Sequence, residues 1–203
     1  MEHKVITIAR TYGSGGRTLG RMLAEEMGIP YYDRDLIRIA SDKSGINVRL
    51  FGQADEKLKS SLFPRKKKVY TGDVLPPESN DFVANDNLFN LQAEVIKEIA
   101  EKESCIIIGR CADYVLKDMP GLLRLYFYAP KKDCIDRVMA VDTGTEREIS
   151  RKIDKIDKYR SDYYYYYTGQ NWKDAENYDL CLNTSSTSYD KLIKIVKNYI
   201  EIM

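Results

Sequence analysis

The chain has 203 residues, with 32 lysines and arginines against 31 aspartates and glutamates. This length suits a single domain, residues 1–203, and the net charge of +1 gives no overall field that would recruit nucleic acid or a membrane. The four cysteines have no C-x-x-C spacing and the only histidine is His3, which argues against a zinc site. The sequence shows neither a signal-peptide pattern nor an apolar run of membrane-spanning length, so we expect a reduced, cytoplasmic protein.

The first distinctive stretch is a β-branched run over residues 5–8, followed by a glycine-rich turn and an apolar helical pattern. Strand, glycine-rich loop and helix together aim backbone N–H groups and a helix N-terminus at a phosphate. Compared with the template G-x-x-x-x-G-K-[ST], the chain keeps Gly16 and Thr18. It has Thr11 in place of the first glycine and Arg17 in place of the lysine. The stretch predicts a phosphate-binding loop; the alternative is a glycine-rich turn without a ligand.

The candidate residues of this loop are Gly13, Ser14, Gly15, Gly16, Arg17 and Thr18. Thr18 opens the helix and can place its hydroxyl on a magnesium ion. Arg17 supplies positive charge as a planar fork, which holds phosphate oxygens bidentately rather than as a compact point charge.

Five short apolar runs predict strands, and helical patterns separate them. The expected strands are 4–9, 29–32, 104–108, 122–129 and 178–182. The expected helices are 17–27, 35–42, 87–102, 111–117, 131–141, 145–167 and 189–202. This alternation predicts an α/β fold, a parallel sheet covered on both faces, in which ligands bind beyond the carboxyl ends of the strands.

Charged residues follow the second and third expected strands. Asp33 comes directly after the second strand, and Arg34 and Arg38 share one face of the next helix. These two guanidiniums suit an acceptor phosphate, while Asp33 either orients a hydroxyl or a magnesium-bound water, or only caps the helix. The third strand ends in Gly109 and Arg110, and an arginine there needs a ligand or an internal carboxylate.

Asp113 is the carboxylate nearest to the end of the third strand, where a Walker-B-type acid is otherwise missing, and it is also the candidate internal partner of Arg110.

Residues 44–85 break the alternation with three prolines and a basic run, 65–68. We expect a partly helical, mobile insertion there. The basic run is either a solvated face or a phosphate or nucleic-acid contact.

The longest expected helix begins near Thr145 and ends in five consecutive tyrosines, 163–167. Arg160 interrupts its apolar stripe, whereas Arg147 and Arg151 fall on another face. An arginine inside an apolar stripe needs a carboxylate, a phosphate or an aromatic face. The tyrosines cannot all face one way, so we expect some to pack in the core and others to line a cleft or interface.

Together these stretches resemble the cytidylate-kinase-like family of P-loop kinases, relatives of the nucleoside monophosphate kinases. The resemblance rests on ITIARTYGSGGRTLG, YYDRDLI, IIIGRCADYVL, LRLYFYAP, the arginine-bearing helix and YDLCLNTSS, in the expected order along nearly the whole chain. It implies a three-layer P-loop NTPase core, adenylate-kinase-like, with a five-stranded parallel sheet, an inserted acceptor-binding lobe at 44–85 and a helical lid at about 145–170. A cytidylate kinase proper has an intact Walker lysine and a different turn after the second strand.

The resemblance also implies roles for single residues. The loop from Gly13 to Thr18 would wrap the donor phosphates of ATP, with Thr18 on magnesium and Thr184 and Ser185 near the donor base. The resemblance implies catalytic roles for four arginines, Arg17, Arg147, Arg151 and Arg160. The acceptor site would comprise Asp33, Arg34, Arg38, Gly109, Arg110 and Asp113.

We therefore expect ATP- and magnesium-dependent phosphoryl transfer to a nucleoside monophosphate such as CMP or dCMP. The alternatives are a kinase for another small acceptor and a nucleotide-binding regulatory protein without turnover, which the missing lysine and missing strand-end acid suggest. Binding of nucleic acid through residues 65–68 ranks last because the overall charge is balanced. Whether the chain forms a homodimer stays open.

Overall fold

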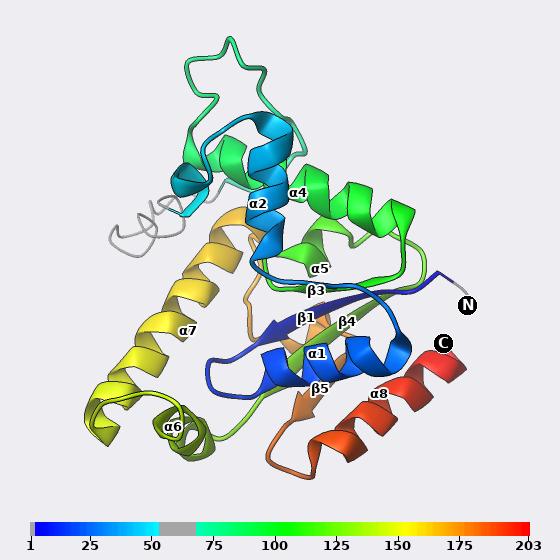
Figure 1. The fold of residues 1–203 in the computed structure, drawn as a ribbon, viewed down its shortest axis with the longest axis vertical. Helices are drawn as coiled ribbons and strands as arrows, with labels where there is room; N and C mark the ends of the chain where they lie inside the picture. Colours follow the sequence, from blue (N-terminus) through cyan, green and yellow to red (C-terminus); the bar gives the residue numbers. More distant parts are fainter. Residues whose placement is uncertain (1–2, 53–67) are drawn as a thin grey trace.

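The computed structural model describes residues 3–52 and 68–203 and has an α/β fold built on one sheet (Figure 1). The sheet has five parallel strands in the order β2-β3-β1-β4-β5. Their bounds are β1 Val5–Arg10, β2 Tyr31–Tyr32, β3 Cys105–Ile108, β4 Leu122–Tyr128 and β5 Leu180–Asn183. The five-stranded parallel sheet predicted from the sequence is confirmed.

The helices follow the predicted pattern, and α8 has the predicted bounds. They are α1 Gly16–Met27, α2 Asp35–Ser44, α4 Asn85–Lys102, α5 Ala112–Val115, α6 Lys131–Met139, α7 Glu146–Thr168 and α8 Tyr189–Ile202, with a 3₁₀ turn, η1, at Ala175–Asn177. The helix α5 begins after Cys111, because Cys111 has a left-handed backbone with φ of 53°, and it ends at Val115, two residues earlier than expected. None of the helices within 3–52 and 68–203 is long and apolar enough to cross a membrane.

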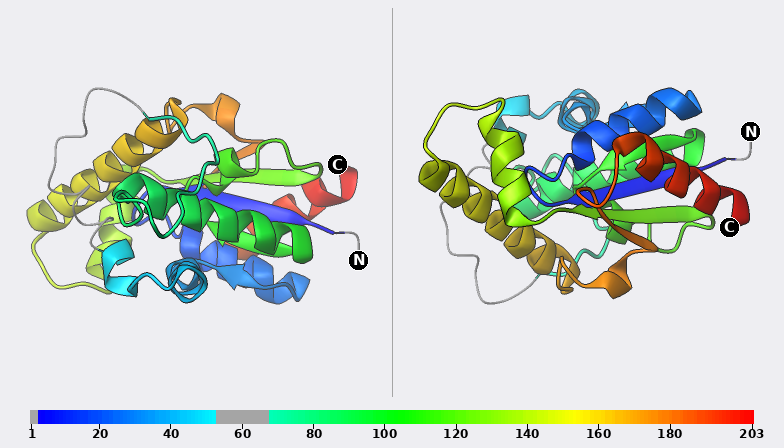
Figure 2. Two further views of the ribbon diagram at one scale, coloured as in Figure 1. Left: turned by 90° about the horizontal axis from the view of Figure 1, so that it is seen from above. Right: turned by 90° about the horizontal axis from the view of Figure 1, so that it is seen from below.

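Helices cover both faces of the sheet, as the views from above and from below show (Figure 2). On one face α1 and α8 pack against strand residues that include Ile6, Ile8 and Leu125. On the other face α4, α5 and the end of α7 cover Val5 and Ile107. Because both faces are occupied, the open positions for a ligand lie at the carboxyl edge, where β1, β2 and β3 end.

The long helix α7 runs past this carboxyl edge, from α6 to the region beneath α2 and α4 (Figure 1). Its first turn is fixed by a capping box between Thr145 and Glu148. Its first half packs on α6 through Ile149 and Ile153. The helix is therefore anchored at its start and lies across the ends of the strands.

The predicted insertion is described only in part. Residues 68–84 contain turns but no helix or strand. The backbone N–H of Lys68 donates to the carbonyl O of Tyr166 at 3.1 Å, and its Nζ lies 2.9 Å from Oδ2 of Asp86. The other basic residues, 65–67, fall outside the described residues. That the insertion is mobile and binds the acceptor stays a prediction.

Candidate active site

The loop between β1 and α1 adopts a conformation that requires glycine at two positions. Gly13 and Gly15 have φ of 79° and 82°. A Cβ atom on Gly13 would lie 2.7 Å from the carbonyl O of Cys134, and one on Gly15 would lie 1.9 Å from the hydroxyl of Tyr189. Packing by α6 and α8 thus holds the loop in one shape.

The start of α1 is open to an anion. Gly15 is the N-cap, no side chain in the described part of the chain caps the helix, and its first turn has no acidic residue. The buried hydroxyl of Ser14 is used within the loop, since it donates to the carbonyl O of Thr11 at 2.8 Å and accepts from the N–H of Gly16 at 3.4 Å. The uncapped N–H groups and the helix dipole favour a negative ligand at this point.

Two adjoining cavities lie where β1, β2 and β3 end. The larger, of about 620 Å³, is lined by the glycine loop and by Lys152 and Lys155 of α7, and we call it the loop cavity. The smaller, of about 180 Å³, is lined by the ends of β1 and β3, by Asp33 and by aromatic residues of α7, and we call it the strand-end cavity. The side chains that line both cavities are Arg10, Arg17, Arg34, Tyr159 and Arg160.

Arg17, which occupies the lysine position of the template, pairs with Asp33 at the end of β2. Its Nη2 lies 2.6 Å from Oδ2 of Asp33, with the arginine side chain 50% exposed and the aspartate side chain 17% exposed. The N-cap of α2 is Arg34, and no side chain in the described residues caps that helix. The alternative that Asp33 only caps α2 is therefore wrong, because its carboxylate forms an ion pair with Arg17 and, within the described chain, makes no capping hydrogen bond.

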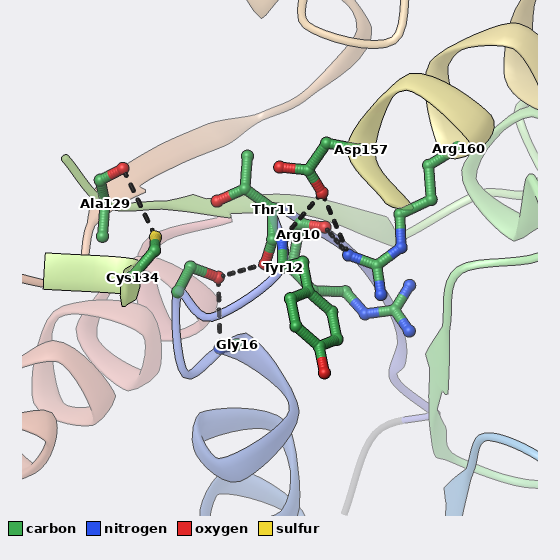
Figure 3. Close-up of polar contacts among 9 residues, drawn as sticks. Arg10, Thr11, Tyr12, Gly16, Ala129, Cys134, Asp157 and Arg160 are labelled. Atoms are coloured by element: carbon green, nitrogen blue, oxygen red, sulfur yellow. Dashed lines mark hydrogen bonds and ion pairs between the residues drawn. The ribbon is translucent and has the colours of Figure 1, made fainter. Parts of the chain in front are cut away.

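The helix α7 is fastened to the loop through one carboxylate and one guanidinium (Figure 3). The N–H of Tyr12 donates to Oδ1 of Asp157 at 2.8 Å, and Nη1 of Arg160 donates to the carbonyl O of Arg10 at 2.9 Å. Arg160 also pairs with Asp157 at 3.4 Å and lies 5.7 Å from the centre of the Tyr12 ring. Burial raises the pKa of Asp157 and lowers the pKa of Arg160. Two desolvated charges thus link α7 to the end of β1.

The other two arginines predicted for the lid, Arg147 and Arg151, lie nearer the start of α7. Arg147 and Arg151 are exposed, and neither lines the loop cavity or the strand-end cavity. Lys152 and Lys155, from the same helix, do line the loop cavity. A catalytic role for the two arginines stays a prediction.

The floor of the strand-end cavity includes a strained turn after β3. Gly109, Arg110 and Cys111 have φ of 70°, 59° and 53°, so three successive residues are left-handed and two of them are not glycine. Such conformations cost on the order of 1–3 kcal/mol each and occur mainly where a site requires them. In this turn Nη1 of Arg110 donates to Oε1 of Gln92 at 3.2 Å, and the side chain lines the cavity.

Asp113, which also lines this cavity, is buried and pairs with Tyr164 rather than with Arg110. The hydroxyl of Tyr164 donates to Oδ2 of Asp113 at 2.6 Å. Burial raises the pKa of Asp113 to about 6, and the hydrogen bond from Tyr164 opposes that rise. Of the predicted acceptor residues, Asp33, Arg34, Gly109, Arg110 and Asp113 meet at this cavity, whereas Arg38 is exposed and does not line it.

Comparison with known proteins identifies the family. Residues 5–186 match the model of the cytidylate kinase-like family. The chain belongs to this family. It is 23% identical over 202 residues to the cytidylate kinase of Archaeoglobus fulgidus, covering 97% of this chain and 94% of that one. It is 26% identical over 209 residues to the cytidylate kinase of Methanopyrus kandleri, covering 97% and 93%.

Solved structures share the fold of this family member. An uncharacterized protein from Eubacterium ventriosum matches with a TM-score of 0.76 and 26% identity over the full length of both chains. The shikimate kinase of Bacteroides thetaiotaomicron matches with a TM-score of 0.56 and 13% identity over 98% of both chains, which shows a common fold alone. The family match and the two cytidylate kinases together support nucleotide kinase activity in general.

In this cytidylate kinase-like chain, Arg137 of α6 joins the loop to the end of β5. Its Nη1 donates to the carbonyl O of Ser14 and to Oγ1 of Thr184, each at 3.0 Å. Its Nη2 donates to the carbonyl O of Thr184 and to Oγ of Ser185, also at 3.0 Å, and the guanidinium lies 5.9 Å from the centre of the Tyr189 ring. An open cavity of about 510 Å³ adjoins these residues. The expected position of the donor base there stays a prediction.

Thr18 is the residue of this loop that the sequence predicts to hold a magnesium ion. It lies in the first turn of α1 and is exposed, beside the uncapped helix start. Magnesium bound with nucleotide phosphates keeps several waters and takes one or two protein oxygens. Thr18 lines neither the loop cavity nor the strand-end cavity, so a role toward a magnesium ion on bound phosphates stays a prediction.

Sequence reasoning missed Arg10 and Arg137. Arg10 is the last residue of a strand, and its one signal is a charged residue at the end of an otherwise apolar run. Arg137 lies on a helix with other charged residues, and its contact with Ser14 joins positions 123 residues apart. No local spacing distinguishes either arginine from a surface residue.

Proposed function

We propose that this chain is a magnesium-dependent phosphotransferase that moves the terminal phosphoryl group of ATP to a nucleoside monophosphate, with CMP or dCMP as the acceptor. The observation that supports it most is the meeting of two cavities at four arginines, Arg10, Arg17, Arg34 and Arg160. One cavity is bounded by a glycine loop and an open helix start, and the other by charged residues at strand ends. A nucleotide donor and an anionic acceptor would meet at the shared arginines.

In this proposal the donor phosphates occupy the loop cavity. The N–H groups at the start of α1 bind phosphate oxygens, and Arg17 adds a guanidinium beside them. Lys152 and Lys155 approach the same space from α7. A magnesium ion held through Thr18 would neutralise charge on the donor phosphates.

The acceptor would occupy the strand-end cavity. Arg34 and Arg110 supply charge for its phosphate, and Asp33 orients a hydroxyl of the acceptor while it holds Arg17 in position. Phosphoryl transfer requires little covalent chemistry from the protein, which must align donor and acceptor, screen their charge and exclude water. The link between α7 and the loop, through Asp157 and Arg160, would close the site from one side.

One observation favours a second candidate, a kinase for a smaller phosphorylated or hydroxylated acceptor. The strand-end cavity measures about 180 Å³, whereas sites for drug-sized ligands usually measure about 300–1,000 Å³. A compact acceptor would fit this cavity without any movement of the surrounding elements, whereas a nucleotide would require the cavity to widen.

A phosphoryl-transfer screen tests the proposal. The purified chain is incubated with labelled ATP and magnesium, and transfer is measured to CMP, dCMP, UMP, AMP, GMP and a panel of sugars and hydroxy acids. Fastest transfer to CMP or dCMP supports the proposal, and transfer only to a sugar or hydroxy acid supports the second candidate. Binding of ATP by calorimetry without transfer to any acceptor would contradict both and indicate a regulatory nucleotide-binding protein.

A further inference from the structure

Arg10 is seated by two glycines at the junction of the two cavities. Its Cβ lies 2.7 Å from the position that a Cβ would take on Gly16, and its Nη1 lies 2.7 Å from the corresponding position on Gly109. A side chain at either glycine would therefore displace the arginine. Gly16 thus leaves room for the aliphatic stem of Arg10, and Gly109 leaves room for its guanidinium, where the loop cavity and the strand-end cavity meet.

Within the described residues, the Arg10 guanidinium makes no direct ion pair in this seat, although the nearby charge of Asp33 offsets part of the effect of burial on its pKa. Within residues 3–52 and 68–203, no carboxylate pairs with it and no oxygen accepts a hydrogen bond from it. It lies instead beside the guanidinium of Arg160 (Figure 3). Burial, and after it the positive charge of Arg160, lower the pKa of Arg10 to about 9. Two like charges in a desolvated site are unfavourable until an anion joins them.

The other arginines shared by the cavities are placed differently. Arg17 is committed to Asp33 at 2.6 Å and is half exposed. Nη1 of Arg160 donates to Oδ1 of Asp157 and to the backbone carbonyl O of Arg10. Arg34 is exposed at the N-cap of α2. Arg10 therefore combines partial burial with N–H donors that are open to a ligand.

We infer that Arg10 is a catalytic residue, whose guanidinium binds the terminal phosphoryl group of the nucleotide as that group passes from the loop cavity to the strand-end cavity. This inference rests on the proposed function. In the step, the bond from the γ-phosphorus to the β–γ bridging oxygen breaks, its electron pair leaves with ADP, and an oxygen of the acceptor forms the new bond to phosphorus. Arg10 keeps its proton throughout and neutralises charge on the oxygens of the transferred group.

The variant Arg10→Met tests this role, because methionine keeps the aliphatic stem that packs on Gly16 and removes the charge. Calorimetry should show ATP affinity reduced about tenfold, since a charge-assisted hydrogen bond is lost, and ADP affinity unchanged. Turnover should fall by about a thousandfold, because the contact strengthens in the transition state. The melting temperature without nucleotide should rise, because the repulsion from Arg160 disappears.

The matched control is Arg21→Met, on the exposed face of α1 and outside both cavities, which should leave nucleotide affinity and turnover unchanged. Arg10→Lys, which restores a charge, should recover part of the preference for ATP over ADP. Equal losses of ATP and ADP affinity, or a lower melting temperature with turnover within tenfold of the unaltered protein, would overturn the inference. If the unaltered protein transfers phosphate to no acceptor, the proposed function fails, and the ATP–ADP comparison still decides whether Arg10 binds the terminal phosphate.

Discussion

The hydroxyl of Tyr164 on α7 donates a 2.6 Å hydrogen bond to Oδ2 of Asp113 on α5, and both side chains line the strand-end cavity. Asp113 is buried, and burial raises its pKa from 3.8 to about 6 even though the hydrogen bond opposes the rise. Burial of this carboxylate in its charged form lowers the stability of the folded chain, a cost that is typical of side chains placed to contact a ligand.

This carboxyl group should make the protein less stable as the pH rises from about 4 to about 6. Over that range the folded chain keeps a proton on Asp113 that the unfolded chain releases, so the free energy of unfolding falls by about 3 kcal/mol. Asp113→Asn removes the titration. Urea denaturation should therefore show the variant gaining about 3 kcal/mol relative to the unaltered protein between pH 4 and pH 7.

The control for this experiment is Asp118→Asn, at an exposed position shortly after α5. Its stability should follow that of the unaltered protein across the same range. A difference between Asp113→Asn and the unaltered protein that does not change with pH would mean that the carboxyl group does not titrate there.

The sequence predicts those parts of the site that depend on local patterns. The glycine loop and the charged residues after β2 and β3 follow from short motifs and from the rule that parallel strands end at one edge. The pairing of Arg17 with Asp33, by contrast, depends on how α1 sits beside β2, and the left-handed backbone at Arg110 and Cys111 has only Gly109 as a local sign. Such contacts arise from tertiary packing, which single-sequence patterns do not encode.

The five consecutive tyrosines illustrate the same limit. The expectation that some pack in the core and others line a cleft is confirmed, because Tyr167 is buried and Tyr163 lines the strand-end cavity, while Tyr165 is 51% exposed. Helical periodicity predicts that division. The partner of each buried hydroxyl, such as Asp113, depends on the neighbouring elements and not on the run itself.

Removing Arg137 should loosen the loop from β5. In Arg137→Ala, the carbonyl O of Thr184 loses the donor that Arg137 supplies, so the free energy of unfolding should fall by about 2 kcal/mol and ATP affinity should fall with it. Chemical denaturation and calorimetry measure the two effects. Lys132→Ala, at an exposed position on α6, should change neither. Unaltered ATP affinity in Arg137→Ala would show that the loop keeps its shape without this anchor.

The charge of Arg17 should matter more than its shape. Arg17→Met should lower turnover at least about a hundredfold, because the start of α1 loses its nearest positive charge. Arg17→Lys keeps that charge and can still reach a phosphate, so its turnover should stay within about tenfold. Steady-state assays with ATP and the preferred acceptor compare the three proteins. Equal losses in both variants would instead point to the bidentate geometry as the essential property.

Arg151 should affect turnover far more than ATP binding if α7 closes on the transferring group. It is exposed in this structure and lies outside both cavities, so Arg151→Ala should leave the dissociation constant for ATP almost unchanged while turnover falls. Arg160→Ala, which also breaks the link to β1, should weaken both. Equal losses in ATP binding and turnover for Arg151→Ala would count against a role in the transition state.

Gly15 should tolerate a side chain only when the residue that faces it is trimmed. In Gly15→Ala the new Cβ would meet the hydroxyl of Tyr189, and the left-handed backbone adds about 1 kcal/mol of strain, so both stability and ATP affinity should fall. Adding Tyr189→Phe removes the clashing oxygen and should restore part of both losses, which denaturation and calorimetry on the two single variants and the double variant can separate. If the losses simply add, the contact between Gly15 and Tyr189 does not set the shape of the loop, and the strain at the helix start alone accounts for the glycine.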